Sequence, residues 1–219
     1  MRLMRHGNAI LVAAALFLSA KGGRADTYLS FTVSTGAVTG SSGFLDFQFG
    51  PGADSQAAFV QIENFSSDGS LNGTAQVSGP NVGGSLPGIV KIDNSTGYND
   101  YYQPFNYGQT FSFTLDVGGP AITAPNGTST YGTSFGLGLL DSNQNNILTN
   151  DQDGFAATVE LNLDGTLTPQ VFPSNDSGGA PVTTIADVAP EPGVWASAGF
   201  GLMLILARRR ARRQPSQPK

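Results

Sequence analysis

The stretch Phe111-Ser-Phe-Thr-Leu-Asp-Val117 alternates apolar and polar side chains over its whole length. Successive side chains of a β-strand point to opposite faces, so this alternation predicts a strand with one face in a core and the other in solvent. Further runs of the same kind occur at residues 28–33, 45–49, 58–65, 90–92, 135–139 and 157–163. Several short strands in one chain are typical of an all-β domain.

Turn signals separate these runs. Five dipeptides combine Asp or Asn with Gly and tolerate the positive φ that tight hairpins require. No window between the two terminal segments has the 3.6-residue apolar period of a helix. Residues 26–172 are therefore predicted to form a single antiparallel β-sandwich, jelly-roll or Ig-like, with almost no helix. The dipeptides are Asp68-Gly69, Asn72-Gly73, Asn126-Gly127, Asp153-Gly154 and Asp164-Gly165.

The N-terminus predicts export. Residues 1–8 carry basic side chains, residues 9–20 form an apolar core, and small residues stand at Gly23 and Ala25. This is the pattern of a secretory signal peptide over residues 1–25, with cleavage between Ala25 and Asp26. The apolar core is too short for a membrane span. The Sec translocon and signal peptidase are the partners that such a segment implies.

The C-terminus has three parts. Pro190-Glu191-Pro192 cannot be helical, because each proline fixes φ and pushes the residue before it toward extended geometry. Residues 193–207 carry no charge and would form a helix of about 22 Å. This is shorter than the hydrocarbon core of a bilayer, which is roughly 30 Å thick. Long basic side chains at the end of the helix can reach the interface and so allow a short helix to span. A basic cluster follows and predicts a cytoplasmic tail at 214–219. Its members are Arg208, Arg209, Arg210, Arg212 and Arg213.

Residues 188–213 resemble the PEP-CTERM sorting signal of Gram-negative bacteria. In that family an integral-membrane cysteine transpeptidase, exosortase, recognises the tripeptide and processes the protein. The resemblance implies that exosortase is a partner, that the chain is held transiently in the inner membrane, and that it ends at the outer surface or in the extracellular matrix. An ordinary single-pass anchor is the alternative. Residues 173–187 read as a flexible Gly/Ser/Pro linker that keeps the tripeptide accessible.

The exported part is strongly acidic and lacks common catalytic residues. Residues 26–187 contain one basic residue, Lys91, against fifteen Asp and Glu, for a formal charge of −14. Binding to nucleic acid is excluded because no cations are available to neutralise phosphates, whereas cationic glycans or divalent metals are suitable partners. The chain has no Cys, and its only His is His6 in the signal peptide. No catalytic residue is therefore assigned, and carboxylate chemistry or oxygen-ligated calcium is what is left.

One loop has weak features of a calcium site. Asp141, Asn143 and Asn145 place oxygen ligands at alternate positions, as calcium loops do. The twelfth position of the loop, Gln152, lacks the usual carboxylate. A polar hairpin loop is the alternative, and no other cofactor is expected.

Two further patterns indicate sugar chemistry. Residues 98–107 combine aromatic rings, which stack on sugars, with amides, which hydrogen-bond to them. An exopolysaccharide is therefore a candidate partner. Packing of these rings in the core is the alternative. Glu63 and Glu160 are the only glutamates of the domain and could form the acid/base pair of a glycosidase, unless both are solvated on outward faces.

Together these patterns predict an exported cell-surface or matrix protein with a structural or adhesive ectodomain. A carbohydrate-binding β-sandwich, assisted by calcium, is the first alternative, and a glycosidase is the second.

Overall fold

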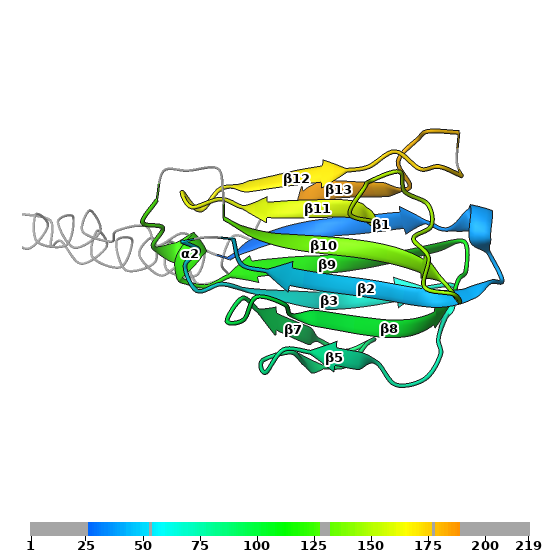
Figure 1. Ribbon diagram of the computed structural model, residues 1–219, viewed down its shortest axis with the longest axis horizontal. Helices are drawn as coiled ribbons and strands as arrows, with labels where there is room; N and C mark the ends of the chain where they lie inside the picture. Colours follow the sequence, from blue (N-terminus) through cyan, green and yellow to red (C-terminus); the bar gives the residue numbers. More distant parts are fainter. Residues whose placement is uncertain (1–25, 53, 128–131, 177, 189–219) are drawn as a thin grey trace, which may run out of the picture. The chain divides into compact units, whose positions relative to one another are not determined.

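The computed structural model describes residues 26–52, 54–127, 132–176 and 178–188. Two β-sheets pack face to face (Figure 1). The only helical segments in these ranges are the 3-10 turn η1 (Gly36–Val38) and the one-turn helix α2 (Pro120–Thr123). The predicted all-β sandwich with almost no helix is confirmed.

The six-stranded sheet has the order β13-β1-β9-β3-β7-β6, and the seven-stranded sheet has the order β12-β11-β10-β2-β8-β4, with β5 also paired to β8. The first contains β1 (Thr27–Ser34), β3 (Phe59–Ser67), β6 (Gly83–Gly84), β7 (Val90–Asp93), β9 (Thr110–Gly118) and β13 (Thr183–Val188). The second contains β2 (Ser42–Gly50), β4 (Ser70–Leu71), β5 (Gln76–Ser78), β8 (Asp100–Asn106), β10 (Thr133–Asp141), β11 (Phe155–Leu161) and β12 (Leu167–Val171).

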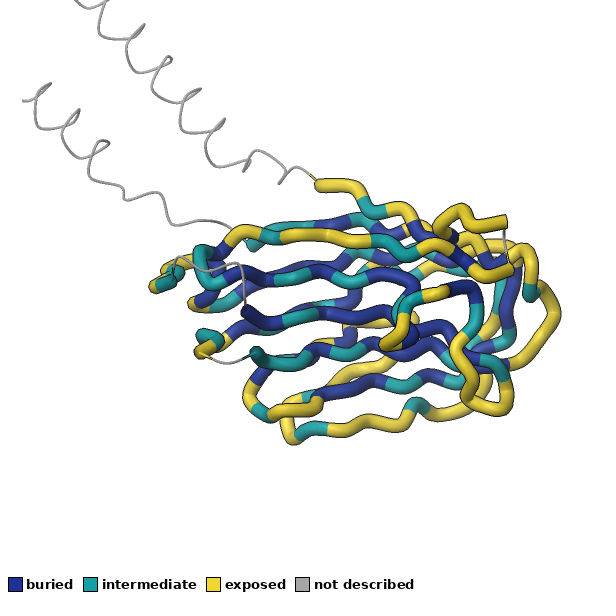
Figure 2. The backbone as a smooth tube through the Cα atoms, turned by 45° about the horizontal axis from the view of Figure 1, so that its top comes forward, coloured by how far each residue is buried: buried dark blue, intermediate teal, exposed yellow. Residues whose placement is uncertain are grey.

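The core lies between the sheets and is rich in aromatic rings. Buried and partly exposed residues alternate along the central strands (Figure 2). The ring of Phe113 on β9 stacks on Phe31 of β1 at 4.6 Å and meets Phe47 of β2 edge-on at 5.4 Å between centroids. Because Phe47 comes from the opposite sheet, this cluster holds the two layers together.

The predicted turns differ in what they connect. Asp164-Gly165 closes the β11–β12 hairpin, with Gly165 at φ 78° and its N–H donating to the carbonyl of Asn162 at 2.9 Å. Asp68-Gly69 does not close a hairpin, because it carries the chain from β3 in one sheet to β4 in the other. A Cβ at Gly69 would lie 2.4 Å from the carbonyl oxygen of Asn106, so close backbone approach explains the glycine there.

The predicted linker at residues 173–187 needs correction. Residues 183–188 form β13 and extend the six-stranded sheet beside β1. Ser34 N donates to the carbonyl of Val182 at 2.8 Å, and Thr183 is buried. The exposed edge of β1 offers unpaired backbone groups, and pairing with this segment satisfies them. The sandwich therefore continues to Val188, two residues before Pro190.

Candidate functional site

A group of acidic, amide and aromatic side chains covers the outer face of the seven-stranded sheet over β2 and β8. We call it the acid-aromatic face and define it as Phe44, Asp46, Gln48, Tyr98, Asp100 and Tyr102. The β2 members alternate with the core residues Leu45 and Phe47, which directs them away from the core. Asp46 lies opposite Tyr102 and Gln48 opposite Asp100, so the two aspartates are diagonal neighbours on adjacent strands.

Aromatic rings border the two carboxyl groups. Phe44 and Tyr102 stack with their centroids 4.6 Å apart. The Tyr98 hydroxyl donates to Asp100 Oδ2 at 3.2 Å, although 55% of Tyr98 is exposed. On the far side of Asp46 lies Gly138 of β10, where a Cβ would come within 3.2 Å of the Asp46 Cβ. The glycine therefore leaves room for the Asp46 carboxyl group.

Both carboxyl groups are buried and incompletely bonded. Asp46 is 8% and Asp100 7% exposed. Gln48 Nε2 donates to Asp46 Oδ2 at 2.7 Å. Within the part of the chain that the structure describes, the buried atoms Asp46 Oδ1, Asp100 Oδ1 and Tyr102 Oη have no hydrogen-bond partner. Buried polar atoms without partners cost free energy and call for an explanation such as a proton or an ion.

A shared proton accounts for part of this arrangement. Burial, followed by the hydrogen bond with Asp100 and the charge of that group, raises the pKa of Asp46 to about 8, and the bond from Gln48 opposes this rise. Two carboxyl groups in contact cannot both ionise cheaply, so one of them keeps its proton at neutral pH. With the proton between them, one carboxyl group becomes a donor to the other.

Among the residues that the structure describes, no basic side chain compensates the acid-aromatic face. Lys91, the sole Lys or Arg of residues 26–187, belongs to β7 in the other sheet. Its Nζ lies 4.2 Å from the centroid of the Phe59 ring. It shares a row on the outer face of the six-stranded sheet with Gln61, Asp116 and Tyr28.

The proposed calcium ligands form a compact loop. Asp141 ends β10, and its Oδ1 accepts hydrogen bonds from the backbone N of Asn143 at 2.8 Å and of Asn145 at 2.9 Å. Asn145 Nδ2 donates to Asp141 Oδ2 at 3.1 Å. The side-chain and backbone bonds from Asn145, together with those from Asn143, lower the pKa of Asp141. This is the geometry of a polar hairpin loop. Across the described ranges, no group of three or more His, Cys, Asp or Glu is placed to hold a metal ion.

The aromatic stretch 98–107 divides between two environments. Tyr101, Phe105 and Tyr107 are buried in the core. Tyr98 and Tyr102 instead belong to the acid-aromatic face. The core-packing alternative therefore holds for three of these rings, and sugar stacking stays open only to the other two.

Glu63 and Glu160 do not form an acid/base pair, and the alternative of two outward-facing carboxylates holds. Glu63 lies on β3 and Glu160 on β11, in different sheets. Glu160 lies between the core residues Val159 and Leu161, and Glu63 follows the core residue Ile62, so each carboxylate faces away from the sandwich. The carboxyl groups that the fold brings together are those of Asp46 and Asp100, which the sequence patterns did not pair.

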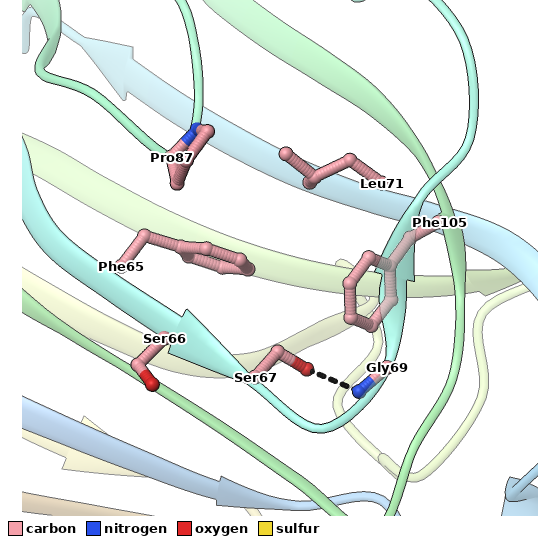
Figure 3. Close-up of a pocket in the computed structure, with 7 residues that line it drawn as sticks. All are labelled: Phe65, Ser66, Ser67, Gly69, Leu71, Pro87 and Phe105. Atoms are coloured by element: carbon pink, nitrogen blue, oxygen red, sulfur yellow. Dashed lines mark hydrogen bonds between the residues drawn. The ribbon is translucent and has the colours of Figure 1, made fainter.

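Two pockets lie elsewhere and hold no charged group among their lining residues. One, of about 300 Å³, is bordered by Phe65, Leu71, Pro87 and Phe105, with Ser67 Oγ accepting a hydrogen bond from Gly69 N at 2.8 Å (Figure 3). The other, of about 410 Å³, lies between β12 and β13 and is lined by Val171, Ile185 and neighbouring prolines and threonines. Neither places polar groups for chemistry as the acid-aromatic face does.

No family model, curated protein or solved structure matches this chain. Among the described residues, no helix has the length and apolar character needed to cross a membrane. The predicted signal peptide, the Pro190-Glu191-Pro192 motif, the apolar segment 193–207 and the arginine cluster lie outside the described residues.

Proposed function

We propose that this protein is exported through the Sec translocon, cut after Ala25, and sorted by an exosortase to the outer surface or extracellular matrix. Its ectodomain has a structural or adhesive role without enzymatic activity. The observation that supports this proposal is the C-terminal order of Pro190-Glu191-Pro192, a short uncharged segment and an arginine cluster. Before processing, the uncharged segment holds the chain in the inner membrane with its arginines on the cytoplasmic side.

We infer a jelly-roll relationship for the ectodomain. Strands β1, β2 and β3 alternate between the two sheets, and so do β7, β8, β9 and β10. An Ig-like sandwich places consecutive strands in the same sheet more often. The alternation therefore favours the jelly-roll over the Ig-like prediction.

Replacing Pro190, Glu191 and Pro192 by Ala tests the sorting proposal. Insertion and orientation should persist because the apolar segment and the arginines are unchanged, and the unprocessed protein should accumulate in the inner membrane. Intact-mass analysis of membrane and surface fractions measures this. A double change of Pro215 and Pro218 to Ala is the matched control and should be processed normally. If the triple variant reaches the surface at the normal rate, the sorting proposal fails and a simple anchor replaces it.

Carbohydrate binding is the form of adhesion that we favour. The acid-aromatic face combines an exposed ring at Tyr98, the Phe44–Tyr102 stack and an amide beside carboxyl groups. Rings of this kind stack on sugars while carboxyl and amide groups bond to hydroxyls. A glycan array with the mature protein should give binding that Tyr98→Ala weakens. Tyr28→Ala, a tyrosine on the other outer face, should leave that binding unchanged.

Calcium assistance at Asp141, Asn143 and Asn145 stays a prediction. Calcium would have to displace the hydrogen bonds that Asp141 already accepts. With one carboxylate in the loop, the affinity should be no tighter than about 10⁻³ M. Excess calcium over chelator should therefore raise the melting temperature only slightly, and an unchanged melting temperature at high calcium would remove the prediction.

A further inference from the structure

We propose that the acid-aromatic face binds an ammonium group, and that an amine-bearing polysaccharide such as a polymer of glucosamine supplies it. This inference rests on the carbohydrate-binding function proposed above and names the ligand class.

The geometry that supports it is a pair of buried carboxyl groups with no donor to these oxygens other than the proton between the two groups. Asp46 Oδ1 and Asp100 Oδ1 belong to adjacent strands, and neither has a hydrogen-bond partner within the described residues. An ammonium group carries three N–H donors and a positive charge, so it can bond to both carboxylates at once. Its charge would offset the cost of keeping two buried carboxylates together.

Aromatic rings surround the same point. The Phe44–Tyr102 stack lies on one side, since Tyr102 is directly opposite Asp46. On the other side Tyr98 reaches Asp100 through its hydroxyl. Rings bordering carboxylates favour cations through their negative faces. Tyr98 is the most exposed member of the group, and its movement would open the way to Asp100.

The cation has to come from outside the ectodomain. Within residues 26–187 the single basic side chain, Lys91, lies on the opposite sheet against Phe59. A second copy of the ectodomain has the same single basic side chain, in the same place. A divalent metal fits less well, because calcium takes six to eight oxygen ligands and no cluster of three or more acidic or His groups occurs in the described residues.

Binding should displace the proton that Asp46 holds in the free protein. The titratable groups around it are Asp100, Tyr98 and Tyr102, with Asp141 beyond Tyr102. Burial, and after it the nearby carboxyl groups, raise the pKa of both tyrosines, so they stay neutral. At pH 6 the Asp46 proton is therefore the one released. Calorimetry in buffers of different ionisation enthalpy measures the number of protons released on binding.

The experiment compares a glucosamine hexamer with an N-acetylglucosamine hexamer, titrated into the mature protein at pH 6 and about 0.15 M salt. The amine form should bind at least about tenfold more tightly and release up to one proton. Asp46→Asn and Asp100→Asn should each weaken binding about tenfold or more, because each removes half of the charged pair. Tyr98→Ala, at an exposed position that folding tolerates, should weaken it severalfold.

Asp116→Asn is the matched control. It makes the same Asp-to-Asn change at another buried aspartate, so it separates the site from general attraction to an acidic domain. Binding should be unchanged in this variant. A loss equal to that of Asp46→Asn would overturn the proposal.

The remaining outcomes separate this inference from the function on which it rests. Equal binding of both hexamers, sensitive to Tyr98→Ala, would keep carbohydrate binding and overturn the ammonium site. Failure of both hexamers and of the glycan array would overturn both. Calcium that binds the unchanged protein and not Asp46→Asn would assign the pair to a metal and overturn the proposal.

Discussion

Asp116 on the outer face of the six-stranded sheet and Asp46 on that of the seven-stranded sheet are placed alike. They are 3% and 8% exposed. Each accepts a glutamine amide at Oδ2, from Gln61 at 2.8 Å and from Gln48 at 2.7 Å. Each also has a buried Oδ1 without a partner in the described part of the chain.

Their charged neighbours differ. Burial raises the pKa of Asp116, with Gln61 opposing, and the positive charge of Lys91 partly counters the nearby acidic groups. Burial also raises the pKa of Asp46, but the group beside it is a second carboxyl, Asp100, which adds to the rise. The charge of each aspartate therefore depends on its neighbours as well as on its burial. Asp116 has one cation nearby, Lys91, which has the smallest effect among the groups acting on its pKa, whereas Asp46 is next to a second carboxyl group.

The raised pKa values of Asp46 and Asp116 make the stability of the fold depend on pH. A carboxyl group whose pKa is higher in the folded than in the unfolded state stabilises the fold most at low pH, and that stabilisation is lost as pH rises through the folded pKa. For Asp46 this window runs from about pH 4 to about pH 8. Asp116 acts in the same direction.

Phe113→Ala should have the largest effect, because it destabilises the packing between the two sheets. Its ring contacts Phe31 in its own sheet and Phe47 in the other, so its removal leaves a cavity beneath both. The free energy of unfolding should fall by about 3–5 kcal/mol. Denaturant unfolding followed by circular dichroism measures this. Tyr98→Ala is the control and should cost less than about 1 kcal/mol; equal losses in the two variants would contradict the assignment of the core.

Asp46→Asn should have the next largest effect, because it removes the pH dependence of stability that Asp46 causes. Asn needs no proton to remain neutral, so at pH 8 the variant should be more stable than the unchanged protein, by on the order of 3 kcal/mol. Near pH 4 the difference should vanish. Unfolding free energies measured across this range test it.

Asp116→Asn is the comparison for that change. Its slope against pH should have the same sign and be smaller, because Lys91 favours the ionised form of Asp116. Identical slopes for the two variants would mean that Asp100 does not distinguish the faces.

Lys91→Met should lower the free energy of unfolding by about 1 kcal/mol or less. It removes an exposed charge and the contact of Nζ with Phe59, and it keeps an apolar side chain of similar length at that position. The pKa of Asp116 should rise further, which carboxyl NMR can follow. The signal of Asp46 serves as the internal control and should not move; an unchanged Asp116 pKa would show that Lys91 does not compensate this face.

Tyr102→Phe should have the smallest effect. It keeps the stack on Phe44 and removes a buried hydroxyl that has no partner among the described residues. Stability should change by less than about 0.5 kcal/mol. Tyr107→Phe is the matched control, because the Tyr107 hydroxyl donates to the carbonyl of Phe44 at 2.7 Å, and it should cost about 1–2 kcal/mol. A loss above 1 kcal/mol in Tyr102→Phe would show that its hydroxyl is bonded.

The strands were predictable where their signal is local. Phe111, Phe113, Leu115 and Val117 alternate with polar residues, and a two-residue period identifies a strand without knowledge of its partners. The Asp164-Gly165 hairpin was predictable for the same reason, since its positive φ is a property of one residue. The end of the sandwich was not. Thr183 to Val188 lack a strong alternation and become a strand only because β1 has a free edge.

Composition and local period were sufficient for the all-β class, for the acidic character of residues 26–187, and for the lack of Cys and His within that range, because each is a sum or a repeat along one chain. Pairing was decided by the tertiary structure. Asp46 and Asp100 meet because β2 and β8 are neighbours in register, and Glu63 and Glu160 are separated because β3 and β11 belong to different sheets. Strand order depends on long-range packing of the whole core, which no short stretch of residues encodes.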